Sequence, residues 1–318
     1  MTPKGAGAGT ALVIGATGLI GRHASTELER AGHQVVRTST TGRDAGLSCD
    51  LTEPESAVAA LEACSPETIV MAAGISSVGA AWEDPEAAFE ANTAGAFHLL
   101  EAIRRAAPSS HLLFASSGSV YGSPEPESPG AGAEPFSEED RLRPGSPYAA
   151  SKAAAEVLCR QYAREYGLSV SVVRIFNQIG PGQTPGQAPA EFALEIARAE
   201  AGGQTRLEVE VGNPGSRRDY TDIRDTSRAL AALAGRRATG TFNLCAGRTA
   251  SIEQIVAGLA AESPVEVGIA VKPGRAHPVD PEMVAGSNRR LVELTGWEPA
   301  VSLAESLAVL LADWRRRV

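Results

Sequence analysis

Short apolar segments alternate with amphipathic, alanine-rich segments up to about residue 175 of this 318-residue chain. The β-branched segments predict strands at 12–14, 34–37, 68–72, 111–115 and 169–175. Between them, apolar residues recur at helical spacing, which predicts helices at 20–31, 54–63, 85–106 and 147–166. Strands and helices that alternate in this way form a parallel sheet with helices on both faces. The pattern therefore predicts a doubly wound α/β fold.

The first predicted strand leads into a glycine-spaced turn that opens a helix. Gly15, Gly18 and Gly21 follow the spacing G-x-x-G-x-x-G, in which the first glycine is placed differently from the G-x-G-x-x-G form. These glycines permit a sharp turn, a close approach of main-chain N–H groups to a pyrophosphate, and tight packing of helix on strand. The turn predicts a dinucleotide site made by the following residues: Gly15, Thr17, Gly18, Leu19 and Ile20.

Proline and glycine mark two breaks along the chain. The stretch 123–146 is dense in Pro, Gly, Glu and Ser and predicts a surface loop. A second such stretch, 180–189, precedes a C-terminal part in which short strands and helices are mixed. We expect a dinucleotide-binding Rossmann domain at 1–179 and a smaller mixed α/β substrate domain at 180–318, with some segments exchanged between them. The long helices 85–106 and 147–166 suit either a four-helix dimer interface or plain coverage of the sheet.

Composition excludes several classes of protein. No apolar run approaches the roughly 20 residues needed to cross a bilayer, and residues 1–9 lack the apolar core of a secretion signal. We therefore expect a cytoplasmic protein that does not bind membranes. A net charge of −9 argues against a nucleic-acid binder. The four cysteines are widely spaced and predict neither a metal site nor a disulfide framework: Cys49, Cys64, Cys159 and Cys245.

A tyrosine and a lysine lie one helical turn apart in the last predicted helix of the alternating part. Tyr148 and Lys152 should share one face of that helix, and Ser117 follows the strand 111–115. A phenol has a pKa of about 10, and a nearby ammonium and the positive charge of an oxidised nicotinamide both favour the phenolate. Y-x-x-x-K alone is an ordinary surface spacing. After a glycine turn and a serine-bearing strand end, however, it predicts a nicotinamide-dependent enzyme with these three catalytic residues.

With these motifs, the chain from Ala11 to about Trp314 resembles the extended short-chain dehydrogenase/reductase family, which acts on nucleotide-diphospho-sugars. Further similar segments are C-D-L at 49–51, M-A-A-G at 71–74, N-T-A-G at 92–95, R-I-F-N at 174–177 and R-D-Y-T-D-I-R-D at 218–225. The resemblance implies cofactor contacts from Asp50, Leu51, Ala72, Ala73, Gly74, Asn92, Tyr148 and Lys152. It implies substrate contacts from Ser76, Ser77, Ser117, Ser119, Asn177 and Arg218.

Three departures from the family pattern narrow the set of reactions that the resemblance implies. Gly118 and Ser119 follow the catalytic serine where dehydratases of the family carry an acidic pair, so a dehydratase is disfavoured. Ser39 stands where the family usually places an aspartate on the adenosine ribose. A small hydroxyl with Arg37 and Arg43 nearby suits the extra phosphate of NADP, with NAD as the alternative.

The third departure is His277, which stands where the family carries an arginine, and Arg275 is expected to supply that charge to the substrate. Within the family, the segments 75–85, 177–183 and 212–219 are most similar to GDP-4-dehydro-6-deoxy-mannose reductases. The resemblance implies a homodimeric, NADP-dependent reductase of the 4-keto group of a nucleotide-linked deoxyhexose. The alternatives are a nucleotide-sugar 4-epimerase that retains NAD, and a non-catalytic nucleotide-sensing or scaffold protein.

Overall fold

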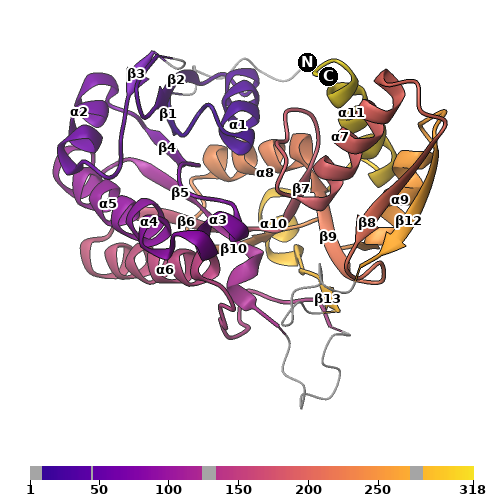
Figure 1. Ribbon diagram of the computed structural model, residues 1–318. Coiled ribbons are helices and arrows are strands. Elements are labelled where there is room, and N and C mark those ends of the chain that lie inside the picture. The colour runs from indigo at the N-terminus through magenta and orange to yellow at the C-terminus, as the bar shows by residue number, and fades with distance from the viewer. Residues whose placement is uncertain (1–8, 44–45, 124–133, 273–281) are drawn as a thin grey trace.

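The computed structural model describes residues 9–43, 46–123, 134–272 and 282–318. Its first lobe is a seven-stranded parallel sheet in the order β10-β6-β5-β4-β1-β2-β3 (Figure 1). These strands are β1 (Thr10–Ile14), β2 (Gln34–Ser39), β3 (Leu47–Ser48), β4 (Thr68–Met71), β5 (His111–Ser117), β6 (Ser169–Ile175) and β10 (Gly240–Leu244). The five predicted strands and the doubly wound fold are confirmed. Strands β3 and β10 were not predicted.

Alternate residues of the strands supply the cores on the two faces of this sheet. Leu12 and Ile14 of β1 pack under α2 (Pro54–Cys64), α5 (Gly95–Ala106) and α6 (Pro147–Tyr166). Ala11 and Val13 pack on the other face, under α1 (Leu19–Arg30), α8 (Ile223–Arg236) and α10 (Arg289–Thr295). Apolar residues fill both faces because a parallel sheet is covered by helices on both sides.

The predicted helix 85–106 is wrong as a continuous α-helix. The chain first forms α3 (Val78–Glu83) and α4 (Pro85–Phe89), and a π-helical turn (Glu90–Ala94) then leads into α5. Asp84 accepts a hydrogen bond from the Ala87 N–H and so starts α4 afresh before Pro85. The wide turn buries Asn92, whose Nδ2 donates to the main-chain oxygen of Ile75 at 3.0 Å and to Ser151 Oγ at 2.9 Å. These two bonds stabilise the π turn by satisfying the buried amide of Asn92.

The second lobe is a mixed α/β unit beside the carboxyl ends of the large sheet (Figure 1). Strand β9 (Arg217–Asp222) pairs with β7 (Asn177–Ile179), β11 (Thr249–Ser251) and β13 (Met283–Val284), while β8 (Arg206–Val211) pairs with β12 (Glu266–Val271). Helices α7 (Ala188–Ala201), α9 (Ile252–Ala260) and α11 (Leu303–Arg315) close its core. Because α8, β10 and α10 return to the first lobe, the chain crosses between the lobes more than once.

Candidate active site

The glycine turn after β1 forms a closely fitted cradle. Gly15 has φ +83°, and a Cβ on it would lie 2.6 Å from the main-chain nitrogen of Ala73 at the end of β4. A Cβ on Gly21 would lie 2.2 Å from the oxygen of Gly15. A side chain is therefore excluded at Gly15 and at Gly21, and α1 begins at Leu19 without a side-chain cap. This cradle fits the pyrophosphate of a dinucleotide, which main-chain N–H groups at a helix N-terminus can bind.

The three proposed catalytic side chains converge at the carboxyl end of β5. Ser117 ends that strand, and Tyr148 and Lys152 lie on the first turns of α6, which begins at the Ser146 cap. The phenol of Tyr148 lies near enough to the hydroxyl of Ser117 for that hydroxyl to affect its pKa. Lys152 Nζ donates to the main-chain oxygen of Ala115 at 2.9 Å. The folded chain thus brings together residues that are 35 positions apart or less but belong to different layers.

Burial dominates the electrostatics of this group. It raises the pKa of Tyr148, while the nearby hydroxyl of Ser117 lowers it. Burial also lowers the pKa of Lys152 to about 8, and Cys159 and Glu156 oppose that shift. The ammonium of Lys152 donates to Ala115 O, and burial stabilises the phenol of Tyr148 in its protonated form. The arrangement therefore suits a proton donor.

The remaining cofactor candidates lie at the ends of β3 and β4. Asp50 Oδ1 accepts from both Thr52 N and Thr52 Oγ1, at 3.0 and 2.8 Å, and Leu51 is buried beside it. Ala72 and Ala73 adjoin the glycine turn, and Gly74 follows with φ +132°. A Cβ on Gly74 would lie 2.1 Å from Asn92 Oδ1. The ends of β4, β1, β2 and β3 thus follow one another along the carboxyl border of the sheet, and the π turn adjoins this border at Gly74.

The end of β2 carries Ser39 and an adjoining hollow. Ser39 Oγ accepts a hydrogen bond from Gly42 N at 3.1 Å, so this side chain first of all closes its own turn. A hollow of about 510 Å³ opens between α1 and β2 and is lined by Ala16, Thr17, Arg22, Thr26 and Arg37. Arg37 lies on the same face of β2 as Ser39 and pairs with Glu29 at 2.9 Å. Arg43 is exposed on the turn beyond.

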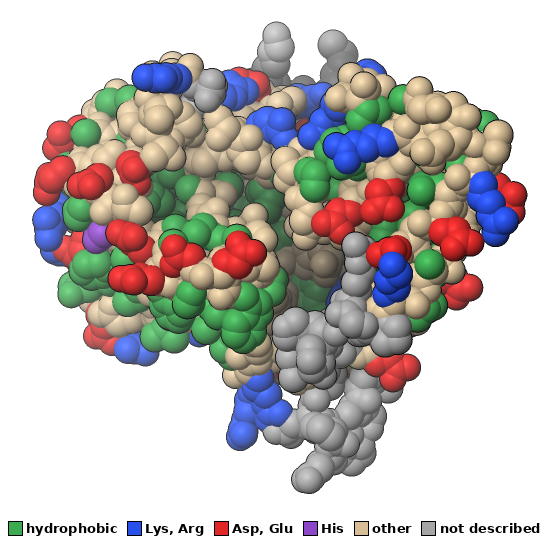
Figure 2. All heavy atoms as spheres, viewed as in Figure 1, with side chains coloured by type: hydrophobic (Ala, Val, Ile, Leu, Met, Phe, Trp, Pro, Cys, Tyr) green, Lys and Arg blue, Asp and Glu red, His purple; other side chains and the backbone are tan. Residues whose placement is uncertain are grey.

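The substrate candidates lie on the second lobe and across the groove from it, and Figure 2 shows the open groove between the lobes. Asn177 opens β7 and is in register with Tyr220, two residues after Arg218 on β9, so Asn177 and Arg218 share one face of the small sheet. Ser119 Oγ donates to Ser117 Oγ at 2.8 Å. Ser76 and Ser77 are exposed before α3, which Ser77 caps. Arg275 and His277 lie outside the described residues.

Comparison with known proteins places the chain in a family. Residues 11–245 match the model of the NAD-dependent epimerase/dehydratase family. The chain belongs to this family. It is 34% identical to GDP-6-deoxy-D-mannose reductase of Pseudomonas aeruginosa, over 96% of this chain and 97% of that one. It is 31% identical to UDP-glucose 4-epimerase of Mycolicibacterium smegmatis, over 96% and 98% of the two chains.

Solved structures of the NAD-dependent epimerase/dehydratase family share the whole fold. RMD from Pseudomonas aeruginosa, complexed with NADPH, matches with a TM-score of 0.84 at 33% identity, over 97% of this chain and 99% of that one. UDP-glucose 4-epimerase of Thermus thermophilus, complexed with NAD, matches with a TM-score of 0.85 at 29% identity, over 97% and 100% of the two chains. This chain is therefore an NAD(P)-dependent sugar-nucleotide enzyme.

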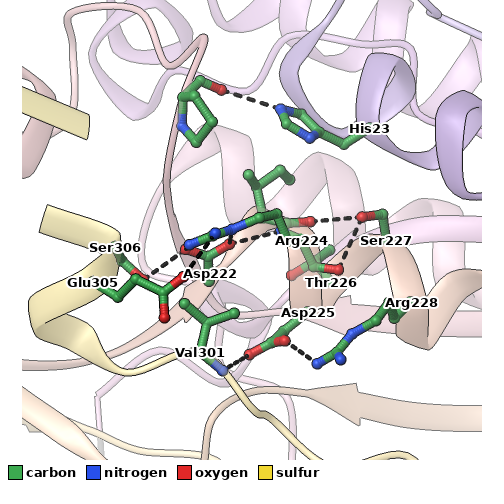
Figure 3. Close-up of polar contacts among 12 residues, drawn as sticks. His23, Asp222, Arg224, Asp225, Thr226, Ser227, Arg228, Val301, Glu305 and Ser306 are labelled. Atoms are coloured by element: carbon green, nitrogen blue, oxygen red, sulfur yellow. Dashed lines mark hydrogen bonds and ion pairs between the residues drawn. The ribbon is translucent and has the colours of Figure 1, made fainter. Parts of the chain in front are cut away.

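Two carboxylates of the R-D-Y-T-D-I-R-D segment at 218–225 form contacts that stabilise the fold (Figure 3). Asp222 accepts from Arg224 N at 2.8 Å and from Ser306 Oγ of α11 at 2.6 Å. Asp225 accepts from Val301 N at 3.0 Å. These carboxylates hold the C-terminal helix against α8, whereas Arg218 and Tyr220 lie on the face of the small sheet that carries Asn177. Among the described residues, no group of three or more His, Cys, Asp and Glu side chains is placed to hold a metal ion.

Sequence reasoning missed one charged pair close to the catalytic side chains, Glu156 of α6 and Arg174 of β6. Both are buried, and they are joined at 2.8 Å. The sequence did carry a signal, because an arginine inside the predicted buried strand 169–175 requires a buried acidic partner. No described helix is long and apolar enough to cross a bilayer.

Proposed function

We propose that this enzyme reduces the 4-keto group of a nucleoside-diphosphate-4-keto-6-deoxyhexose and uses NADPH as the reductant. The observation that carries the proposal is the end of β2, where Ser39 replaces a carboxylate and Arg37 and Thr17 line the adjoining hollow. A carboxylate there would repel a ribose phosphate, whereas a guanidinium attracts it. The similarity to GDP-6-deoxy-D-mannose reductase supports the same reaction.

Three residues of the chain have different roles in the reduction. When bound, NADPH supplies a hydride to C4 of the sugar. Ser117 donates a hydrogen bond to the C4 carbonyl oxygen, and Tyr148 transfers its phenolic proton to that oxygen, so that C=O becomes CH–OH. Lys152 stabilises the negative charge that develops on the phenol. The phenol then regains a proton from solvent.

The remaining site candidates bind the two ligands. Asn177 and Arg218, which share a face of the small sheet, bind the diphosphate of the sugar nucleotide, and Arg275 adds charge there. Ser76, Ser77 and Ser119 bind the hexose. The glycine turn binds the cofactor pyrophosphate, and Ser39 and Arg43 lie at its ribose phosphate. The border formed by Asp50, Leu51, Ala72, Ala73, Gly74 and Asn92 contacts the rest of the cofactor.

The second candidate function is 4-epimerisation of a nucleotide hexose with retained NAD. The similarity to UDP-glucose 4-epimerase favours it, because the same serine, tyrosine and lysine could oxidise and re-reduce one carbon. The deciding experiment identifies the nucleotide released when the purified protein is denatured, and then supplies GDP-4-dehydro-6-deoxy-mannose with NADPH. Consumption of NADPH with formation of a 6-deoxyhexose supports the reductase. Retained NAD with interconversion of UDP-hexoses supports the epimerase.

We also propose that the enzyme is a cytoplasmic homodimer, joined through a four-helix bundle of α5 and α6 from each copy. Phe97 on α5 and Val157 on α6 are 42% and 59% exposed, and Phe89 on α4 is 41% exposed. Figure 2 shows hydrophobic surface over α4 and α6 at the lower left. A second copy would remove this apolar surface from water.

A further inference from the structure

A buried ion pair joins α6, the helix that carries Tyr148 and Lys152, to β6. Arg174 of β6 meets Glu156 of α6 with both ends of its guanidinium, Nη2 to Oε2 at 2.8 Å and Nε to Oε1 at 3.0 Å. Their side chains are only 2% and 0% exposed. Buried ion pairs often add little to stability, because desolvation offsets the attraction. The position of this pair therefore calls for a role beyond holding the fold together.

The glutamate connects the two elements that carry the catalytic side chains. Glu156 follows Lys152 by one helical turn on the same face of α6. Its Oε1 accepts a hydrogen bond from Ser116 Oγ at 2.6 Å, and Ser116 immediately precedes Ser117. Lys152 binds Ala115 O, the next residue back along β5. Two adjacent ties thus fix the register of α6 against the end of β5, and with it the placement of Tyr148 beside Ser117.

The arginine extends the same network away from the catalytic helix. Arg174 Nη1 donates to Tyr121 OH at 2.8 Å and to the main-chain oxygen of Glu138 at 3.2 Å. Tyr121 OH donates to Asn243 Oδ1 at 2.6 Å, and its ring stacks on Phe136 with 4.7 Å between centroids. The segment 136–138, which lies within the loop predicted at 123–146, is thereby joined to the ion pair.

We propose that Glu156, held by Arg174, is a positioning residue of the reaction: it ties α6 to β5 and places a negative charge beside the buried ammonium of Lys152. The proposal rests on the function assigned above to Tyr148 and Lys152. The titratable groups on α6 that face Lys152 are Tyr148, Glu156 and Cys159, and from β5 it meets Ala115 O and, at 5.2 Å, the Phe114 ring. Arg174 approaches from β6 on the far side of Glu156.

The test compares three variants with the wild type. Glu156→Gln keeps the shape and removes the charge, so kcat should fall roughly 10- to 100-fold with little change in KM for the sugar nucleotide. In a profile of kcat against pH, the limb that reports the titration of Lys152 should move to lower pH. Ser116→Ala removes only the tie to β5 and should lower kcat without moving that limb. Arg160→Ala, which removes the outer, exposed partner of Glu156, should leave both unchanged.

A second readout needs no turnover. The folded pKa of Lys152 is about 8 and the unfolded value is about 10.4, so between these values the unfolded chain binds the extra proton. The stability of the wild type relative to Lys152→Met should therefore rise as the pH increases through this window. With Glu156→Gln in both proteins, the rise should begin at lower pH.

The proposal would be overturned if Glu156→Gln changed neither the pH at which stability begins to rise nor the position of the limb in the profile of kcat against pH. A normal kcat in Ser116→Ala would also overturn it. If Tyr148→Phe retains full turnover while Glu156→Gln still shifts the pH at which stability rises, the proposed function fails and the coupling of Glu156 to Lys152 stands. If Glu156→Gln does not fold, the loss of kcat in the milder Ser116→Ala variant decides the positioning role.

Discussion

The phenol of Tyr148 lies beside the hydroxyl of Ser117 where α6 meets the end of β5. A carbonyl oxygen that takes its place between them would contact both groups at once. Tyr148→Phe should therefore lower turnover by roughly 10²–10⁴-fold, the usual effect of removing a positioned proton donor. Affinity for cofactor and sugar nucleotide should persist in calorimetry. Tyr166→Phe, at the exposed end of the same helix, is the matched control, and near-normal turnover in Tyr148→Phe would exclude the assignment.

Cofactor choice should depend on the hollow beside the glycine turn. Arg37→Ala should weaken NADPH binding more than NADH binding, because only NADPH carries the ribose phosphate. The preference of the wild type for NADPH should shrink with added salt, and Ser39→Asp should reverse it. Dissociation constants for both cofactors measure the effect, with Arg30→Ala on the outside of α1 as the control. Equal affinity of the wild type for the two cofactors would contradict this prediction, and Arg43→Ala shows whether the turn beyond β2 contributes.

Arg218 should bind the sugar nucleotide in preference to the cofactor. Loss of a charge-assisted contact costs about 1.5–3 kcal/mol, so Arg218→Ala should weaken sugar-nucleotide binding by roughly 10- to 100-fold and leave NADPH binding unchanged. Arg289→Ala removes an equal charge from a side chain that is 83% exposed and should have no effect. Calorimetry with GDP, UDP, dTDP and CDP sugars would also identify the base. An unchanged affinity in Arg218→Ala would refute the role.

His111 should make stability depend on pH. Burial lowers its pKa to about 4, and its ring nitrogens meet Ser169 Oγ and Ser171 Oγ at 2.8 and 3.2 Å. Because the unfolded value is about 6.5, this contribution is complete above pH 6.5 and is lost as the pH falls toward 4. The loss should reach up to about 3 kcal/mol in denaturant unfolding. His111→Gln should lack it, and an identical pH dependence in that variant would count against the buried neutral imidazole.

The proposed dimer depends on apolar surface on α5 and α6. Val157→Glu places a charge at the centre of that surface and should yield monomers in sedimentation at micromolar concentration. Val271→Glu is the control, because Val271 is 55% exposed on β12 of the second lobe. A dimer that survives Val157→Glu, or a wild type that is monomeric, would rule out this interface.

Sequence patterns predicted those parts of the fold whose signals are local. The strand and glycine turn at 10–21 could be predicted because a β-branched run and fixed glycine spacing depend on neighbouring residues. The break within 85–106 could not be predicted, because its cause is the contact of Asn92 with Ser151, 59 residues away. Likewise the return of β10 to the edge of the large sheet depends on pairing with β6, about 70 residues earlier.

The candidate site likewise has residues that a local sequence pattern could predict and residues that none could. The spacing of Tyr148 and Lys152 is visible in the sequence, and so is the serine after β5. The segment 218–225 was predicted to bind substrate through Arg218 alone, and its carboxylates Asp222 and Asp225 hold α11 and the residues before it. Their partners Ser306 and Val301 lie more than 70 positions away, so no local pattern could separate a structural carboxylate from a ligand-binding one.

The loop at 180–183 joins the beginning of the chain to its end. Arg22 and His23 of α1 contact the oxygens of Gly182 and Pro181, at 2.8 and 3.1 Å. Asp313 of α11 accepts from Gly182 N at 2.8 Å, and Arg317 donates to Gln183 O at 2.8 Å. The loop therefore couples α1 to α11, and any displacement of it would remove contacts from both helices at once.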